Sequence, residues 1–506
     1  MLLADLVATS AALSATRSRN AKTAAVAVLL RTAEVEELEI VVSYLAGSLR
    51  QRRTGLGWKG VADLPPPADV PTLEVAEVHA IFEEISAVAG SGSQARRRAL
   101  VDDLFARATG DEQRMLRGLV TGELRQGAQE GTMLEAIAAA ADVPAPAVRR
   151  AAMLGGALGP VAVAARAGGV AALEEFALEL MRPVRPMLAG SAPTVADAAA
   201  NHPDEPQIWD TKLDGIRIQV HRDGDEVRIW TRTLDDITTR LPEIVATTRA
   251  LPAERLVLDG EAIALTDSGR PRPFQETASR TATRSASSAD DVPVSAFFYD
   301  VLHVDGDDLL DQPLRDRLAE LDRVVPEENR TPRLLTADPG EAQAFFDDIL
   351  GRGHEGVIVK RPGSAYEAGR RGSGWVKVKP VHTLDLVVIA VEWGSGRRRG
   401  KLSNLHLAVR DPDSPTGLTM VGKTFKGMTD EMLAWQTERF LGLETSREGH
   451  VVHVRPEQVV EIAYDGVQTS TRYAGGVALR FARVLRYRDD KTPDQADVLD
   501  SLHDRL

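Results

Sequence analysis

The chain has 506 residues, more than one hydrophobic core usually holds, so its length predicts about three domains. It contains no cysteine, which excludes disulfides and cysteine-ligated zinc and favours a reducing cytoplasm. No basic segment precedes the first apolar residues, and no run of roughly eighteen apolar residues is free of charge. We therefore expect a cytoplasmic protein that neither enters a membrane nor is exported.

The formal net charge of −13 argues against a nucleic-acid partner, but the distribution of charge matters more than its sum. Residues 361–410 contain ten Lys or Arg and three acidic residues, and residues 470–491 contain six basic and two acidic residues. The sequence therefore predicts a basic surface formed by the second half of the chain.

Residues 1–182 are predicted to form an all-α domain. Apolar residues recur there at helical spacing, as in Val75-Val78-Ile81-Phe82-Ile85 and Met115-Leu116-Leu119-Val120. The prolines of Arg182-Pro183-Val184-Arg185-Pro186 end this pattern.

Residues 183–381 are predicted to form a strand-rich α+β domain, in which Glu276 to Asp291 reads as a mobile polar loop. After Pro380 the pattern gives strands at Leu384–Trp393, Leu402–Arg410 and Leu418–Phe425, a helix from Thr429 to about Leu441, and strands near Val451 and Val459. A helix between the third and fourth of about five strands is the order of an OB-fold barrel, which we expect for residues 382–506.

Lys212 stands at the mouth of a predicted β-hairpin. Ile216, Ile218 and Val220 share one face of its first strand, and an Asp223-Gly224 turn leads to the return strand. A lysine with an arginine close by, here Arg217, lies where cations can favour the neutral, nucleophilic amine. A plain exposed lysine at a strand end is the alternative.

Arg232 ends the return strand of this hairpin, which could bring it back beside Lys212. Guanidinium groups bind phosphate oxygens in a bidentate manner, so Arg217, Arg232 and Lys212 together favour a phosphate site.

Two glutamates follow apolar strand patterns. Glu261 ends the strand that begins at Leu256, and a buried carboxylate requires a cation or hydroxyl partner, in the simplest case a salt bridge. Glu355 is predicted to share a strand face with Val357 and Val359, with Lys360 on the opposite face. Two glutamates near phosphate-binding residues suit a divalent cation, Mg²⁺ or Mn²⁺.

Three further segments carry aromatic rings or positive charge. Phe297-Phe298-Tyr299-Asp300 places rings at a strand end, either in a core or stacked on a purine. Lys377 and Lys379 share one strand face, which favours an anion between them. The array from Arg480 to Lys491 is either a solvated edge or a mobile cationic group that approaches a leaving pyrophosphate.

These segments, in this order, resemble the ATP-dependent DNA ligases of the three-domain type found in archaea, in eukaryotic replication and in some bacteria. The resemblance is carried by Lys212-Leu213-Asp214-Gly215, Asp259-Gly260-Glu261, Tyr299-Asp300, Glu355 to Lys360, Lys377-Val378-Lys379 and Arg480 to Lys491. Glu123 to Gly127 followed by Met133 to Ile137 is similar, less specifically, to a helix entry of the family's DNA-binding domain. Ala482 stands where the family commonly has proline, which affects only the local loop.

The resemblance implies that Lys212 attacks the α-phosphate of ATP, that AMP passes to the 5′-phosphate of a nick, and that the 3′-hydroxyl then seals the strand. It also implies a monomer that encircles nicked duplex DNA during replication, repair or recombination, near the nucleoid in a bacterial cell. The implied nucleotide contacts are Asp210 through its backbone, Arg217, Arg232, Glu261, Tyr299, Arg371, Lys377 and Lys379, and the implied metal ligands are Glu261 and Glu355. Tyr299 is favoured over Phe298 as the stacking ring because it directly precedes Asp300.

Other nucleotidyl-transfer enzymes share part of this pattern. An RNA ligase or an mRNA-capping guanylyltransferase has the first five motifs, but the large helical region and the basic C-terminal segment argue against both. A nicotinamide-dependent DNA ligase would require a cysteine zinc site, and the chain has no cysteine. A non-catalytic nucleic-acid clamp is disfavoured by the presence of Lys212, Glu261, Glu355 and Lys377.

Overall fold

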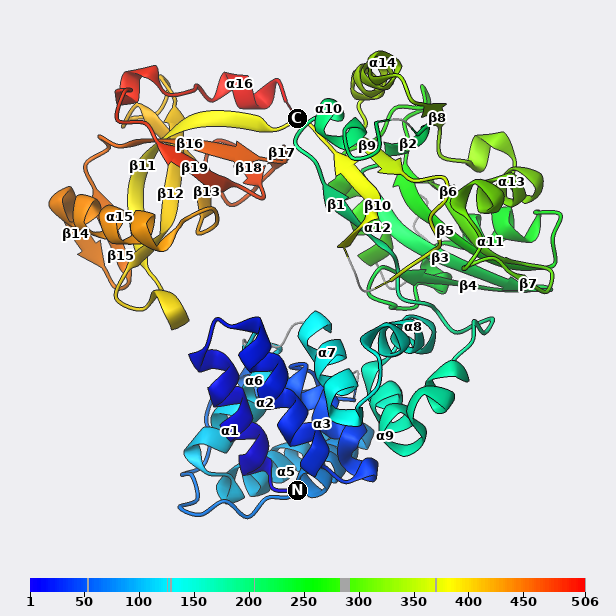
Figure 1. Cartoon of the computed structure of the whole chain (residues 1–506). Coiled ribbons are helices and arrows are strands. Elements are labelled where there is room, and N and C mark those ends of the chain that lie inside the picture. Colours follow the sequence, from blue (N-terminus) through cyan, green and yellow to red (C-terminus); the bar gives the residue numbers. More distant parts are fainter. Residues whose placement is uncertain are drawn as a thin grey trace.

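The computed structural model describes the chain except residues 52–53, 125, 128–129, 204, 283–291, 369–370 and 506, and except the side chains of residues 281–282, 371–373 and 397. Three bodies follow one another along the chain, each with its own apolar core (Figure 1). No helix in these described ranges is both long and apolar enough to cross a bilayer.

The N-terminal region is built from helices packed around one core. They include both segments in which the sequence predicted helical spacing, which are confirmed as α4 and α6. The helices are α1 (Leu3–Ala15), α2 (Arg19–Thr32), α3 (Leu38–Leu45), α4 (Val75–Ala87), α5 (Ser93–Arg107), α6 (Gly110–Thr121), α7 (Glu130–Ala141), α8 (Ala145–Gly155) and α9 (Leu158–Glu174).

Two five-stranded sheets form the middle region. The first has the order β1-β10-β9-β2-β8 and the second β4-β3-β5-β6-β7. The strands are β1 (Leu188–Ser191), β2 (Gln207–Lys212), β3 (Ile216–Asp223), β4 (Glu226–Thr231), β5 (Arg255–Ala264), β6 (Val294–Val304), β7 (Asp307–Asp308), β8 (Arg333–Thr336), β9 (Gly356–Lys360) and β10 (Arg371–Val378). The helices are α10 (Val195–Ala199), α11 (Pro242–Arg249), α12 (Phe274–Ala282), α13 (Leu314–Val324) and α14 (Pro339–Gly351).

Three predictions for this region can be compared with its strands and helices. The hairpin is confirmed as β3 and β4, paired from Ile218 with Thr231 to Asp223 with Glu226. The predicted loop from Glu276 is wrong as far as Ala282, because α12 covers these residues and buries Thr277 and Arg280; the rest of that prediction lies outside the described residues. Glu261 and Tyr299 do not end strands, since β5 and β6 continue beyond them.

The C-terminal region contains a seven-stranded sheet, and its predicted strands and helix are confirmed as β11, β12, β13, α15, β15 and β16. β16 pairs with both β11 and β19. The elements are β11 (His382–Trp393), β12 (Leu402–Arg410), β13 (Leu418–Thr424), α15 (Asp430–Gly442), β14 (Glu444–Glu448), β15 (Val451–Val454), β16 (Val459–Tyr464), β17 (Gly466–Thr469), β18 (Val477–Arg480), β19 (Arg483–Tyr487) and α16 (Asp500–His503).

A further apolar cluster crosses from the helical region into the middle region. Met153 and Leu154 of α8 pack in it with Tyr366 and Trp375. The connecting segment is held as well, because Gln219 receives a hydrogen bond from the backbone N–H of Val184 (2.7 Å) and donates one to its carbonyl oxygen (3.1 Å). The end of the helical region is therefore fixed to the face of β3 that also carries Arg217.

Candidate active site

Lys212 lies where the chain crosses from one sheet of the middle region to the other. It is the last residue of β2, and β3 begins at Ile216 in the second sheet. Gly215 permits this crossing, because a Cβ there would lie 2.3 Å from the carbonyl oxygen of Ala262. Lys212 therefore precedes the hairpin, as predicted, but it belongs to β2 in the other sheet.

A cavity of about 440 Å³ opens between the two sheets beside Lys212. Most of the residues predicted for the site border it. They are Asp210, Lys212, Arg217, Arg232, Glu261, Tyr299 and Lys377. Glu355 and Lys379 border a second cavity of about 910 Å³, which reaches the C-terminal region. The side chain of Arg371 lies outside the described residues.

The ammonium group of Lys212 donates a hydrogen bond to Glu355. The other oxygen of Glu355 accepts one from Lys379 at 3.2 Å. Although burial alone would raise it, the two ammonium groups lower the pKa of Glu355 below its usual range. Glu355 thus holds two lysines at the junction of the two cavities.

Gly356 explains why Glu355 points towards Lys212. The φ of Gly356 is 144°, and a Cβ there would lie 2.2 Å from the carbonyl oxygen of Val378. The alternation of β9 therefore does not extend to Glu355. Val357 and Val359 are buried in an apolar cluster, and the prediction that Glu355 shares their face is wrong.

Arg217 is held by protein groups at the wall of the first cavity. Its Nε donates to Asp259 at 3.0 Å, its Nη2 donates to the same carboxylate at 2.5 Å, and its Nη1 donates to the carbonyl oxygen of Met187 at 2.6 Å. Arg232, by contrast, has no hydrogen bond or ion pair with any described residue. Of the two arginines, Arg232 is the one available to a phosphate.

Asp210 and Lys360 form a buried ion pair at the floor of this cavity. Lys360 also donates to the carbonyl oxygen of Tyr299 at 3.1 Å and lies 4.6 and 4.3 Å from the ring centres of Tyr299 and Trp375. Burial raises the pKa of Asp210 in spite of Lys360. Neither carboxylate oxygen has a well-directed hydrogen bond, so Asp210 can accept one from a ligand.

Glu261 has no hydrogen bond or ion pair with the described residues, although Lys212 and Arg217 are near enough to act on its charge. Burial raises the pKa of Glu261 to about 8. A carboxylate in this state gains from a cation or a hydroxyl donor, and together with Glu355 it fits a divalent cation that takes its other ligands from phosphates and water. The described residues contain no group of three or more His, Cys, Asp or Glu side chains that could hold a metal ion.

The C-terminal region reaches the second cavity through two ion pairs. Asp465 accepts a hydrogen bond from Lys379 at 2.6 Å, and Arg480 donates one to Asp214 at 3.1 Å. Although burial opposes the effect, the carboxylates of Asp465 and Glu355 raise the pKa of Lys379. The junction between the two regions therefore lies directly beside Lys212.

The remaining members of the basic C-terminal array bind acidic groups on their own sheet. Arg486 pairs with Glu461 at 2.6 Å, and Arg488 and Lys491 both pair with Asp385. In this arrangement only Arg480 of the array extends to the middle region, at least among the side chains that the structure describes.

The sequence did not single out Lys360 or Trp375 as cavity residues, and it favoured Tyr299 over Phe298 as the ring of the site. Ile358 and Lys360 border the cavity because they alternate with the buried Val357 and Val359 on β9. Tyr299 borders the cavity, whereas the neighbouring Phe298 is completely buried in the core of the second sheet. The period of two could have assigned both, since Trp375 shares a face of β10 with Lys377 as Lys360 shares a face of β9 with Ile358.

Models of three sequence families match consecutive parts of the chain. They are described as "DNA ligase N terminus" (residues 62–138), "ATP dependent DNA ligase domain" (residues 186–379) and "ATP dependent DNA ligase C terminal region" (residues 398–491). The RNA ligase and capping-enzyme alternatives are thereby set aside.

Relatives and a solved structure agree with these matches. A "Probable DNA ligase" of Nocardioides sp. (strain ATCC BAA-499 / JS614) is 62% identical over 100% of this chain and 99% of its own length. A protein of the same name from Beutenbergia cavernae is 62% identical over 99% of both chains. The structure named "Pmar-Lig_PreS3" shares the fold, with a TM-score of 0.62 and 17% identity over 96% of this chain and 99% of that one. The chain belongs to the family of ATP-dependent DNA ligases.

Proposed function

We propose that the amine of Lys212 is the nucleophile through which this DNA ligase transfers AMP. Nζ of Lys212 attacks the α-phosphorus of ATP, so that an N–P bond forms and the bond from phosphorus to the pyrophosphate oxygen breaks. An oxygen of a 5′-phosphate at a nick then takes the AMP, and the adjacent 3′-hydroxyl displaces AMP to form the phosphodiester. The observation that carries this proposal is that Lys212, Arg232, Glu261, Tyr299 and Lys377 border one cavity.

The floor of the cavity suits an adenine base. The rings of Tyr299 and Trp375 lie there at 5.8 Å from each other, edge to face. The buried Asp210 carboxylate, which lacks a well-directed hydrogen bond, can accept one from the exocyclic amine of adenine. A guanine would present a carbonyl oxygen to the same carboxylate, so this arrangement favours ATP over GTP.

The phosphates would lie nearer the lysines. Arg232 and Lys377 border the same cavity and would bind the α-phosphate region, together with Arg371. Once Lys379 breaks its bond with Asp465, it would reach the outgoing pyrophosphate. After Arg480 breaks its bond with Asp214, it would approach the same pyrophosphate. The basic segment would thus stabilise the leaving group in the first step.

Glu261 and Glu355 would hold Mg²⁺ or Mn²⁺. A divalent ion there would neutralise phosphate charge during both transfers. Glu261, which has a raised pKa and no cationic partner among the described residues, supports this assignment. Lys212 and Lys379 both donate hydrogen bonds to Glu355, so an ion would compete with these lysines for its carboxylate.

We also propose the finer division of the chain. Residues 1–182 would be an all-α DNA-binding domain, 183–381 the adenylation domain and 382–506 an OB-fold. The helices α1 to α9 and the pairing of β16 with both β11 and β19 support these assignments. Met153 and Leu154 pack with the adenylation domain, so the first boundary is a rigid joint.

The three domains would encircle nicked duplex DNA as a monomer. Ion pairs connect each region with the other two: Arg17 with Asp430, Arg150 with Asp311, and Arg480 with Asp214. The Arg17–Asp430 pair joins the first region to the third and is exposed and therefore weak, so a ring closed by it can open to admit DNA. Phosphate contacts would make binding salt-sensitive and indifferent to sequence. Because ATP and chromosomal DNA meet there, we place the protein in the cytoplasm, at the nucleoid in a bacterial cell.

The test is to incubate the protein with ATP labelled at the α-phosphate, Mg²⁺ and a nicked duplex, and to resolve protein and DNA on denaturing gels. Label on the protein that is removed by acid but not by alkali, together with a sealed strand, is expected for a phosphoamide at a lysine. Sealing without any protein-bound label at early times would contradict the role given to Lys212.

A further inference from the structure

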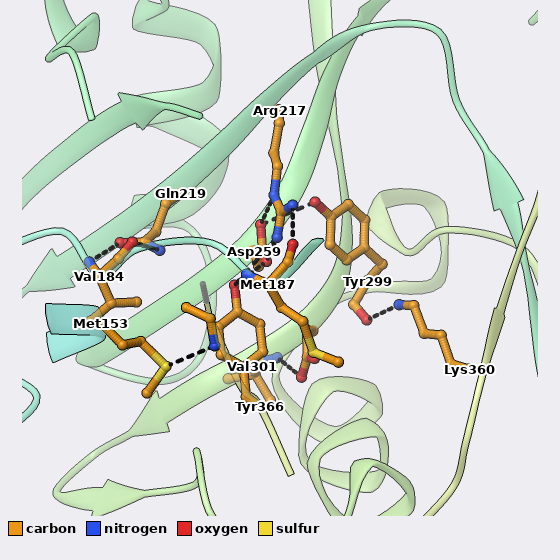
Figure 2. A network of polar contacts seen from close by, with 12 residues as sticks. Met153, Val184, Met187, Arg217, Gln219, Asp259, Tyr299, Val301, Lys360 and Tyr366 are labelled. Atoms are coloured by element: carbon orange, nitrogen blue, oxygen red, sulfur yellow. Dashed lines mark hydrogen bonds and ion pairs between the residues drawn. The ribbon is translucent and has the colours of Figure 1, made fainter. Parts of the chain in front are cut away.

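Asp259 is a buried carboxylate whose two oxygens accept four hydrogen bonds from side chains around the cavity (Figure 2). Two come from Nε and Nη2 of Arg217, one from the hydroxyl of Tyr299 at 3.0 Å, and one from the hydroxyl of Tyr366 at 2.7 Å. Asp259 is 1% exposed and does not border the cavity itself. Its orientation therefore decides how Arg217 and Tyr299 face a ligand.

Tyr366 is the one donor of this set that stays away from the cavity. Its hydroxyl donates to Asp259 and accepts hydrogen bonds from the backbone N–H of Met187 (3.1 Å) and from Nη2 of Arg217 (3.3 Å). One donated and two accepted bonds satisfy a hydroxyl completely. Burial raises the pKa of Tyr366 well above its ordinary value, so the hydroxyl keeps the proton that it donates.

The ring of Tyr366 is itself fixed from several sides. It is fully buried and meets Trp375 edge to face at 6.0 Å, and its backbone N–H donates to the carbonyl oxygen of Leu310 at 2.8 Å. Two residues further on, the N–H of Ala368 donates to the sulfur of Met153, on α8 of the helical domain, at 3.3 Å. The hydroxyl therefore has little freedom to follow Asp259, and Asp259 must adapt to it.

We propose that Tyr366 is a positioning residue for self-adenylation, which fixes Asp259 so that Arg217 and Tyr299 are aimed into the nucleotide cavity. The inference rests on the nucleotide site proposed above. Without the hydroxyl, Asp259 would keep three of its four donors and could rotate, and the N–H of Met187 would be left buried without an acceptor. Both changes would loosen the wall against which the base is expected to stack.

The test is Tyr366→Phe in the full-length chain, which removes one oxygen and keeps the buried ring. The rate of Lys212 labelling is measured at rising ATP concentrations in single turnover, which separates KM from kcat. Stacking on a base is present in both ground and transition state, so its loss raises KM and leaves kcat nearly unchanged. Because a hydrogen bond to a charged group is lost, we expect KM for ATP to rise roughly tenfold.

Tyr487→Phe is the matched control. Tyr487 is also a largely buried tyrosine, but its hydroxyl donates to Gln436 at 2.7 Å in the C-terminal domain, far from Asp259 along the chain. Tyr487→Phe loses one part-buried hydrogen bond, whereas Tyr366→Phe loses three, so both variants are compared at a temperature well below their measured midpoints. We expect an unchanged KM for ATP in Tyr487→Phe.

The outcomes separate this inference from the proposed function. If the parent protein takes no label, the proposed nucleotide site fails; if the parent takes label and Tyr366→Phe has the same KM, only the role of Tyr366 fails. A fall in the labelled fraction with an unchanged KM would also overturn it, since that is the effect of damaged folding. Should Tyr366→Phe not fold, Tyr299→Phe removes another hydroxyl from Asp259, and an unchanged KM in that variant overturns the inference.

Discussion

The charged groups near the two cavities are held in different ways. The carboxylates of Asp259 and Asp300 are at most 1% exposed. Each accepts two hydrogen bonds from one arginine, Asp259 from Arg217 and Asp300 from Arg317. Around Lys212 the members of the network, Glu355, Lys379 and Asp465, are each 24% exposed and belong to two different domains.

This difference separates groups that are set before the substrate arrives from groups that must be displaced by it. A buried ion pair is expensive to break, because each charge loses its only compensation. A partly exposed pair is weak, and a phosphate or a divalent cation can replace either member. In the proposed nucleotide site, the buried side would therefore hold the base end of ATP, and the exposed side would exchange its carboxylates for phosphates.

Lys212→Ala should remove protein-bound label completely, because it removes the proposed nucleophile. Of the other lysines that border the cavity, Lys360 is buried and Lys377 is assigned to binding the α-phosphate region. Labelled ATP and a denaturing gel measure this directly. Lys423→Ala is the matched control, since Lys423 is similarly exposed and also pairs with a glutamate, Glu392. Persistent label in Lys212→Ala would move the nucleophile elsewhere.

Arg317→Met should lower the free energy of unfolding by about 3–5 kcal/mol, since it leaves the fully buried Asp300 carboxylate without its arginine. Arg317 also donates to the carbonyl oxygen of Ser364 at 3.0 Å, so it supports the segment that carries Tyr366. Denaturant unfolding followed by circular dichroism measures the change.

Arg323→Met is the control for that experiment, because Arg323 lies on the same helix α13 and pairs with Glu320 at the surface. It should change the free energy of unfolding far less than Arg317→Met does. Equal effects of the two substitutions would remove the distinction between buried and exposed charges.

Much of the scaffold could be predicted from local pattern. The alternation after Ile216 gave the β3–β4 hairpin, and the strands β11 to β13 followed from apolar runs between turn residues. β14 was missed because its five residues are polar and almost all exposed, which leaves no alternation. α12 was predicted as a loop because it is rich in Ser, Thr and Ala, and the two residues that it buries, Thr277 and Arg280, are polar.

The site was predictable only in part, for a different physical reason. Residues such as Lys212 and Glu261 stood out because their chemistry does not suit a strand end or a core. The contact of Lys212 with Glu355, however, joins residues 143 positions apart, and that of Arg480 with Asp214 joins residues 266 apart. No local periodicity encodes such pairs, and the hydroxyl of Tyr366 acts through Asp259, a residue 107 positions away.

Glu261 provides a prediction that depends on pH. Its pKa of about 8 lies above the ordinary value of 4.5, so at pH 7 the free protein holds a proton there that a bound cation would displace. Binding of Mg²⁺ and ATP to Lys212→Ala at pH 7 should therefore release about one proton, and the affinity should rise with pH up to about 8. Calorimetry in two buffers of different ionisation enthalpy counts the protons.

The double variant Lys212→Ala, Glu261→Gln is the control for proton release, because the amide cannot titrate. It should release fewer protons under the same conditions. The same shift also destabilises the empty protein as pH rises from about 4.5 to 8, since the unfolded chain loses this proton first. Equal proton release from both variants would assign the proton to another group.

Asp465→Asn should have the smallest effect, and it tests whether the exposed side of the network is exchangeable. The ammonium group of Lys379 donates hydrogen bonds to both Asp465 and Glu355. Removing the charge of Asp465 makes this ammonium group more available to a phosphate. We expect KM for ATP to fall by up to about fivefold, the range of a partly exposed ion pair, and the difference to shrink as salt is added. Glu461→Gln, which breaks the surface pair with Arg486 on the same domain, should leave KM unchanged. A higher KM in Asp465→Asn would mean that the domain contact helps to bind ATP, and the exposed network would then be as preorganised as the buried one.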